Sequence, residues 1–210
     1  MTSNKKNHDK LIIITGPTAC GKTSMAVKLA SDLNGEIISA DSRQIYHGMN
    51  IGTGKDLEEY FYKGKLIPYH LIDILNPNIN YSVYNFQKDF IKSYKSILKR
   101  DKLPIVCGGT GLYIESLLLN YDFSLSPPPN NELRNQLKNK SIKELKEQLI
   151  SMNPTIEKNQ KMDTKNRIIR NIEIASTPAI KRNKINQLPL RNFTVIGLFP
   201  GRTININKID

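Results

Sequence analysis

Short apolar runs alternate with amphipathic stretches along this chain. The apolar runs predict strands at 11–14, 36–40, 70–74, 103–107 and 195–198. Between them, apolar positions spaced near 3.6 residues predict helices, of which the clearest are 83–100 and 110–119. A further helix is expected at 24–30, directly after the first strand. This order predicts an α/β fold with a mostly parallel sheet and helices on both faces.

A proline-rich stretch, 126–130, interrupts this rhythm. The helix patterns that follow, at 131–138, 141–151 and 163–175, are polar and basic with few apolar positions. We interpret them as a helical insert beside the core. The predicted organisation is a disordered leader at 1–9, a core at 10–126, a basic helical insert at 127–190, and 191–210 with the last core strand and the start of a C-terminal helix.

The most specific motif is the stretch Gly16–Thr23, which fits G-x-x-x-x-G-K-[ST] between the first apolar run and a predicted helix. Glycines let successive N–H groups point at an anion, and the helix dipole adds positive charge there. Lys22 supplies a full charge and the Thr23 hydroxyl can hold Mg²⁺. The motif predicts a phosphate or diphosphate site made of Gly16, Pro17, Thr18, Ala19, Cys20, Gly21, Lys22 and Thr23.

Two further polar blocks also follow predicted strands. Asp41 can act as a general base, bind Mg²⁺ through water, or cap a helix. Thr110 offers a hydroxyl to a ligand or caps the helix behind it, and the glycine-rich turn 50–55 is a weaker signal. Because ligands of parallel sheets bind at the carboxyl ends of strands, we expect these blocks to converge with the phosphate loop on one crevice.

Several ring-bearing residues have two readings. Tyr81, Tyr84 and Phe86 are able to stack on a base, but their spacing favours packing in the core. His70 precedes an apolar run and is interpreted as structural, and no role is assigned to His47.

Charge is distributed unevenly. The 210-residue chain has a net charge of +12, of which residues 1–130 carry +3 and residues 131–210 carry +9. A basic segment beside a phosphate-binding core favours a polyanionic partner such as nucleic acid, although a generally Lys- and Asn-rich composition explains part of the charge.

Other global features indicate a cytoplasmic, monomeric protein. Cys20 and Cys107 have no partner at a metal-like spacing and are expected to be reduced thiols. The polar N-terminus does not resemble a signal peptide, and no apolar run approaches the ~18 residues of a membrane span.

Taken together, the blocks resemble one family. The ranges 16–23, 39–46, 49–55, 70–74, 81–86 and 104–113 are similar in order and spacing to blocks of the tRNA dimethylallyltransferases, also called tRNA isopentenyltransferases. Two more similar blocks lie at 129–134 and 163–174, so the resemblance covers about residues 10–205.

The resemblance implies a P-loop NTPase-like fold and a prenyl transfer. Dimethylallyl diphosphate would donate its dimethylallyl group to N6 of the adenosine beside the anticodon of tRNA, and diphosphate would leave. The loop 16–23 and Arg202 would bind the donor diphosphate, with Mg²⁺ at Thr23 and Lys22 neutralising the leaving group. Asp41 would accept the N6 proton and Thr110 would touch the target nucleotide.

The resemblance also implies a set of contacts to the tRNA anticodon stem-loop. They are Asp41, Ser42, Arg43, Gln44, Thr110, Arg134, Asn166, Arg167, Ile168, Ile169 and Arg170.

The chain departs from the family's pattern in three places. The family usually continues with further helices, so we expect the C-terminal helix to be truncated here; Lys208 stands where an arginine is usual. The insertion 56–69 is longer than in many members. Three alternatives stay open: an isopentenyltransferase that uses free adenine nucleotide, a P-loop small-molecule kinase, and an inactive truncated RNA-binding remnant.

Overall fold

The computed structural model describes residues 10–123, 127–154, 162–177 and 192–201. The chain divides into two compact units, one made of 1–121 with 187–210 and the other of 122–186. The predicted leader, Arg202, Lys208 and the start of the C-terminal helix lie outside the described residues.

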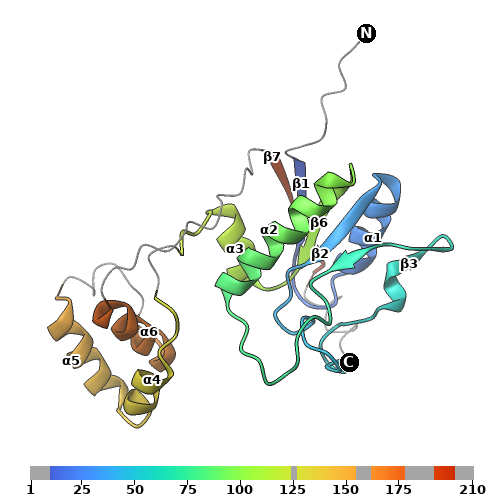
Figure 1. The fold of residues 1–210 in the computed structure, drawn as a ribbon. Helices are drawn as coiled ribbons and strands as arrows, with labels where there is room; N and C mark the ends of the chain where they lie inside the picture. The colour runs from blue at the N-terminus through green and yellow to red at the C-terminus, as the bar shows by residue number, and fades with distance from the viewer. Residues whose placement is uncertain (1–9, 124–126, 155–161, 178–191, 202–210) are drawn as a thin grey trace. The chain divides into compact units, whose positions relative to one another are not determined.

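The first unit is built on a five-stranded sheet. Its strands are β1 (Lys10–Thr15), β2 (Gly35–Ser39), β5 (Tyr69–His70), β6 (Leu103–Gly108) and β7 (Asn192–Gly197). They follow the order β5-β2-β6-β1-β7, and all neighbouring pairs are parallel. The central strands run beside one another in Figure 1, with Ile13 opposite Val106 and Ile14 opposite Cys107. The predicted parallel sheet is confirmed.

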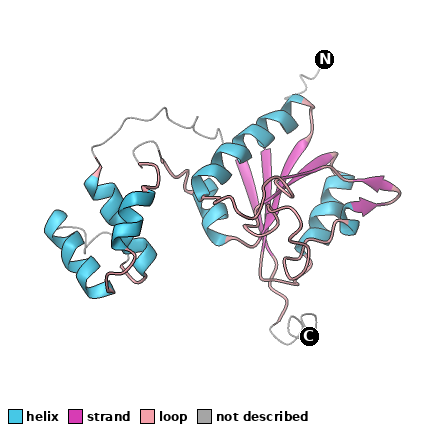
Figure 2. Ribbon diagram, turned by 60° about the horizontal axis from the view of Figure 1, so that its bottom comes forward, coloured by secondary structure: helices cyan, strands magenta, loops and turns pink. Residues whose placement is uncertain are grey.

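Helices cover both faces of this sheet (Figure 2). Helix α1 (Lys22–Asp32) packs Ala26, Val27 and Ala30 against sheet residues that include Ile14, Ile37 and Ile105. Helices α2 (Val83–Lys99) and α3 (Gly111–Leu118) pack together on the other face. The doubly covered strands are therefore almost wholly apolar, as expected for a parallel sheet.

Aromatic residues form much of the core beneath α2. Phe86, Phe90, Tyr94 and Ile97 are buried on one face of this helix, which confirms the predicted periodicity. Phe86 stacks on Tyr113 of α3, with ring centroids 4.2 Å apart and planes 8° apart. Phe86 thus packs in the core, as the helical spacing of apolar residues predicted.

The third predicted strand is much shorter than expected. It was predicted over 70–74, but β5 ends at His70 because Leu71 and Asp73 have φ values of 62° and 51°, which an extended strand cannot contain. The insertion before it holds elements that the apolar pattern did not reveal: a 3₁₀ turn, η1 (Glu58–Tyr60), and the hairpin strands β3 (Phe61–Tyr62) and β4 (Lys65–Leu66).

A buried carboxylate on β2, that of Glu36, joins this strand to the end of α2 and to β5. The Glu36 side chain is 5% exposed and accepts hydrogen bonds from Arg100 Nε at 3.0 Å and Nη2 at 2.6 Å. Its Oε2 also lies 2.7 Å from His70 Nε2. Burial by itself would raise the pKa of Glu36, but the hydrogen bonds from Arg100 and His70 outweigh it and hold the pKa below its ordinary value. His70 is therefore structural, as predicted.

The second unit consists of α4 (Asn131–Leu137), α5 (Ile142–Met152) and α6 (Lys165–Ser176), close to the three predicted ranges. Its small core is made of Leu137, Leu145, Leu149, Ile168, Ile169 and Ile172. The side chains of Asn130 and Ser141 cap α4 and α5. Within the described ranges, no helix of either unit is long and apolar enough to cross a membrane.

We predict that Glu36 makes stability depend on acid pH. A carboxylate whose pKa is lowered by folding stabilises the native state above its unfolded pKa, and this contribution is lost as the pH falls through the folded pKa. Glu36→Gln should therefore be less stable than wild type at pH 7, and the difference should shrink toward pH 3. Denaturant titrations across pH would measure this, with the exposed Glu58→Gln as the control. A pH-independent difference would contradict the assignment.

Candidate functional site

The phosphate loop joins β1 to α1 and has the backbone that an anion site requires. A Cβ on Gly16 would lie 2.4 Å from the carbonyl oxygen of Leu198 and 2.9 Å from Cys20 Sγ, so only glycine fits there. No side chain caps the N-terminus of α1, which leaves its first N–H groups available to a ligand. Lys22 Nζ folds back over the loop and donates to the Pro17 carbonyl at 2.5 Å. The loop therefore presents amides and one ammonium group to the same space.

This space is a cleft of about 690 Å³ at the carboxyl ends of the strands. The predicted blocks do converge on it: Asp41–Gln44 after β2 and Cys107–Thr110 at the end of β6 line it together with Thr18–Thr23. Its remaining walls come from Gly52–Gly54, Asp56, Glu59 and Tyr60. Most of this lining is predicted by the sequence motifs, but Asp56, Glu59 and Tyr60 are not.

Thr110 links the two strand ends that face the phosphate loop. Its Oγ1 accepts a hydrogen bond from the Ser42 N–H at 2.9 Å and donates to Ser42 Oγ at 3.3 Å. Thr110 immediately precedes α3, but its hydroxyl makes no capping bond to that helix. The hydroxyl therefore holds the two strand ends together instead of capping the helix.

Asp41 lies half-buried on the cleft wall, and no helix follows it. One carboxylate oxygen, Oδ1, accepts from the Arg43 N–H at 2.9 Å, which fixes the side chain in a local turn. The helix-cap reading of Asp41 is thus replaced by a turn that orients the carboxylate at the cleft.

The close approach of β2 and β6 depends on Gly108. A Cβ at this position would lie 2.3 Å from the Ala40 carbonyl oxygen and 2.4 Å from its carbonyl carbon. The neighbouring Gly109 is different, because a Cβ there would meet only Gly16 O at 3.5 Å and Lys22 Nζ at 4.0 Å. Gly108, and not Gly109, sets the separation of Asp41 from Thr110.

Two acidic residues that the sequence analysis did not single out also line the cleft. The Glu59 carboxylate lies near the Thr23 side chain, and Asp56 is close enough to act on it electrostatically. Burial raises the pKa of Glu59, the Asp56 charge raises it further, and the nearby Thr23 side chain opposes this. The signal for them was the acidic stretch Asp56–Glu59 directly after a glycine-rich turn. Glu59 thus places a carboxylate near the Thr23 hydroxyl, which the motif assigns to Mg²⁺, and Asp56 lines the same cleft.

Of the two cysteines, Cys107 is not suited to nucleophilic chemistry. Both thiols are free, as expected for a reduced protein. Burial raises the pKa of Cys107 to about 12, so it is a neutral thiol at physiological pH. Cys20 lies within the phosphate loop, 3.7 Å from Lys22 Nζ.

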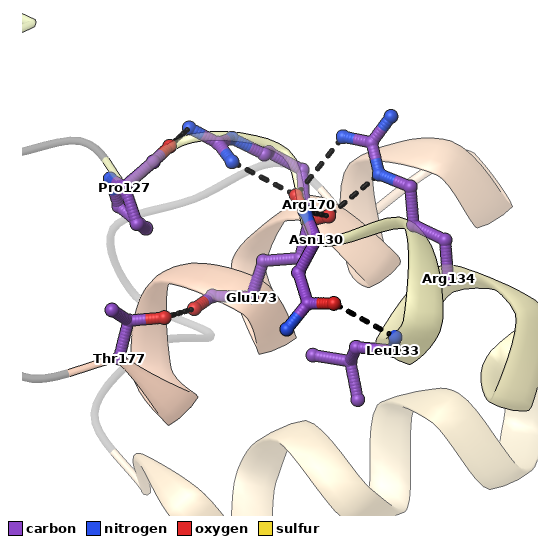
Figure 3. Close-up of polar contacts among 7 residues, drawn as sticks. All are labelled: Pro127, Asn130, Leu133, Arg134, Arg170, Glu173 and Thr177. Carbon is purple, nitrogen blue, oxygen red and sulfur yellow. Dashed lines mark hydrogen bonds and ion pairs between the residues drawn. The ribbon is translucent and has the colours of Figure 1, made fainter.

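In the helical unit, Arg134 and Arg170 both pair with one buried carboxylate. Figure 3 shows both guanidinium groups on the carboxylate of Glu173, whose side chain is 1% exposed. Arg134 donates through Nε at 2.6 Å and Nη2 at 3.0 Å, and Arg170 through Nη1 at 2.8 Å. Arg170 Nη2 also donates to the Pro127 carbonyl at 2.7 Å. Their first role is to hold α4, α6 and the preceding segment together.

Glu173 is the centre of this arrangement. Burial would raise its pKa, but hydrogen bonds from Arg134, Arg170 and the Asn130 N–H outweigh burial and lower the pKa. Since both arginines share one buried carboxylate, some of their N–H donors are already used within the helical unit.

The remaining predicted RNA contacts divide by burial. Ile168 and Ile169 are buried in the core of the helical unit, so their side chains serve packing, and the expected contact of the segment 166–170 with tRNA stays a prediction. Asn166 and Arg167 are exposed on α6, and Arg167 pairs with Asp163 one turn earlier at 2.5 Å. The spacing of the motif could not separate the buried face of this helix from its exposed face.

Comparisons with known proteins agree with this architecture. The model of the IPP transferase family matches residues 44–210, and that of the isopentenyl transferases matches residues 9–69. The chain belongs to the IPP transferase family.

Its relatives in the IPP transferase family include curated proteins and solved structures. It is 49% identical over 202 residues to tRNA dimethylallyltransferase 1 of Azobacteroides pseudotrichonymphae, covering 96% of this chain and 65% of that protein. It is 48% identical over 203 residues to tRNA dimethylallyltransferase 2 of Bacteroides fragilis, covering 95% and 64%. The chain thus spans just under two thirds of the length of these curated relatives.

Two solved structures share its architecture. The tRNA isopentenylpyrophosphate transferase of Bacillus halodurans is 33% identical with a TM-score of 0.60, covering 96% of this chain and 63% of that one. A eukaryotic dimethylallyltransferase acting on tRNA has a TM-score of 0.68 at 22% identity, covering 92% and 49%, and supports the fold alone. The P-loop NTPase-like α/β fold inferred from the sequence is confirmed in this IPP transferase family member.

We predict that Gly108→Ala will disturb the site of this IPP transferase family member, whereas Gly109→Ala will not. The first adds a methyl group against the Ala40 backbone and should lower the unfolding free energy by about 1–3 kcal/mol, the usual cost of overpacking. It should also weaken pyrophosphate binding by moving the cleft wall. Denaturant unfolding and calorimetry measure the two effects, and equal behaviour of both variants would refute the steric argument.

Proposed function

We propose that the protein transfers the dimethylallyl group of dimethylallyl diphosphate to N6 of the adenosine adjacent to the anticodon in tRNA. One observation carries this proposal: the phosphate loop, Asp41 and Thr110 share a single cleft in a chain of the IPP transferase family. A diphosphate site beside a carboxylate suits the displacement of a diphosphate by a nucleophile that must lose a proton. The names of the relatives favour tRNA as the acceptor over the small molecule of a kinase.

The donor diphosphate binds at the phosphate loop in this proposal. The loop amides, the N-terminus of α1 and Lys22 stabilise negative charge that grows on the leaving oxygen as the C–O bond breaks. Thr23 and Glu59 fit Mg²⁺, because hydroxyl and carboxylate oxygens are the ligands this ion prefers. When bound there, Mg²⁺ supplies further charge neutralisation to the diphosphate.

Asp41 acts on the acceptor. N6 of adenine forms the new C–N bond to the dimethylallyl carbon while diphosphate departs, and the N6 proton passes to the Asp41 carboxylate. The base must leave the stack for this geometry, because N6 is otherwise paired or stacked. Thr110, Ser42, Arg43 and Gln44 line the same cleft and contact the target nucleotide in this proposal.

Asp41→Asn should separate chemistry from donor binding. The amide keeps the shape of the side chain and removes the base, so turnover should fall by about 100-fold or more with donor affinity retained. Lys22→Met should instead weaken donor binding, because it removes the ammonium charge from the anion site. Turnover is measured as transfer of labelled dimethylallyl to an unmodified anticodon stem-loop. Donor affinity is measured by calorimetry with dimethylallyl diphosphate. Lys28→Met, at an exposed position on α1, is the control.

Four results would redirect this assignment. Full turnover by Asp41→Asn would refute its role. Labelling of free adenine nucleotide but not of tRNA would favour the nucleotide isopentenyltransferase. Phosphoryl transfer from ATP to a small acceptor would favour a kinase. RNA binding without transfer at any donor concentration would indicate an inactive remnant.

RNA binding should fall on the exposed basic residues of the helical unit. Arg134 and Arg170 are used by Glu173, so we propose that Arg167, Lys138 and their exposed neighbours contact phosphates. Arg167→Ala with Lys138→Ala should reduce the slope of log affinity against log salt by about one to two. Filter binding across salt concentrations measures it. Lys88→Ala with Lys95→Ala, two exposed lysines of α2, is the matched control, and an equal effect would mean that overall charge alone matters.

A further inference from the structure

Lys55 is a fully buried lysine in a loop at the molecular surface. It ends the glycine-rich turn whose residues Gly52–Gly54 line the cleft, yet its own side chain is 0% exposed. The ammonium group donates to Asp73 Oδ1 at 2.5 Å, to the Tyr46 carbonyl at 2.7 Å and to Asn50 Oδ1 at 3.3 Å. An ammonium group has three donors, so Lys55 has none left for a substrate.

These bonds tie together two segments that are distant in sequence. Asp73 comes from the loop after β5, where its φ of 51° turns the chain toward residues 44–47. In that region the Asp73 N–H donates to the Gln44 carbonyl at 3.0 Å, and the Ile74 N–H donates to the Ile45 carbonyl at 2.9 Å. The His47 N–H in turn donates to the Leu75 carbonyl at 2.7 Å. The segment 41–55 is thus hydrogen-bonded to the segment 71–75 at several points.

Gln44 connects these bonds to the cleft, which it lines. Its Oε1 accepts from Ser39 Oγ at 2.9 Å at the end of β2, and its Nε2 donates to the Gly54 carbonyl at 2.9 Å, next to Lys55. A continuous path therefore runs from Asp73 through Lys55 and Gly54 to Gln44, three residues from Asp41. Neither Lys55 nor Asp73 is among the residues that line the cleft.

Outside these bonds and the Ser42–Thr110 contact, the segment has no regular secondary structure to hold it. It contains no helix or strand between β2 and η1, and Gly48, Gly52 and Gly54 all have positive φ, so its unrestrained backbone would be mobile. A buried ammonium group that loses its carboxylate partner is strongly disfavoured, which makes the pair an effective restraint on both segments.

We propose that Lys55 and Asp73 form a positioning pair that holds the segment 41–54 in place against the phosphate loop. The pair acts without touching either substrate: it fixes Gln44 and the glycine-rich turn, and through them the Asp41 carboxylate. The effect on turnover rests on the proposed prenyl transfer, whereas the effect on loop order does not.

The test compares Lys55→Met, Asp73→Asn and the double variant in the full chain. Lys55→Met should leave the pyrophosphate Kd within about twofold, because the phosphate loop is separate from the pair. Its kcat for tRNA should fall about tenfold to a hundredfold, as expected for a misplaced reacting group. Amide exchange by mass spectrometry should accelerate in 41–55 and 71–75 but not in β1, β6 or α1.

The double variant distinguishes positioning from stability. It removes both charges, so the Asp73 carboxylate is no longer left without its counter-charge and part of the thermal stability should recover relative to Lys55→Met, while kcat stays low. Recovery of kcat together with stability would overturn the proposal, as would an equal loss of pyrophosphate affinity and kcat, or unchanged exchange in 41–55. If the wild-type chain transfers no prenyl group, accelerated exchange confined to 41–55 and 71–75 still supports the pair, and exchange spread over the sheet refutes it.

Discussion

The close approach of β2 and β6 is the constraint on which the site depends. The Ala40 N–H donates to the Cys107 carbonyl at 2.8 Å, and the Thr110 N–H then donates to the Ala40 carbonyl at 3.2 Å. These bonds extend the parallel ladder beyond the last strand residues and leave no room for a side chain at Gly108. Asp41 and Thr110 leave the sheet together because the two backbones cannot separate there. The phosphate loop, one strand away on β1, faces the same opening.

Much of this site could be predicted from the sequence, because its strongest signals are local. The phosphate loop is a continuous motif between a strand and a helix, and parallel strands place their carboxyl ends on one edge. The convergence of Asp41 and Thr110 follows from those two facts. The cleft walls from Asp56 and Glu59 do not follow, because a 3₁₀ turn inside a long insertion brings them there and no periodicity marks such a turn.

Two features could not be read from the sequence, and the physical cause is the same for both: tertiary packing decides them. The run 70–74 is apolar enough for a strand, but positive φ values at Leu71 and Asp73 let tertiary hydrogen bonds to residues 44 and 45 replace a sheet ladder. In α6, the motif named Ile168 and Ile169 together with Arg167 and Arg170, although a helix turns adjacent residues to different faces. Only the packing of the three-helix unit shows which of them are buried.

The arrangement around Glu36 and Glu173 bears on which basic residues are interchangeable. Of the 31 lysines and arginines only eight are arginines, so lysine is the common cation of this chain. Arg100 and Arg134 each hold a buried carboxylate through the same two nitrogens, Nε and Nη2, which lysine does not possess. Lysine should replace Arg167, whose pair with Asp163 is exposed, with little loss, but not Arg100 or Arg134. If lysine replaces arginine elsewhere in related chains, arginine should be kept at positions 100 and 134, because the tertiary structure requires a planar guanidinium group there.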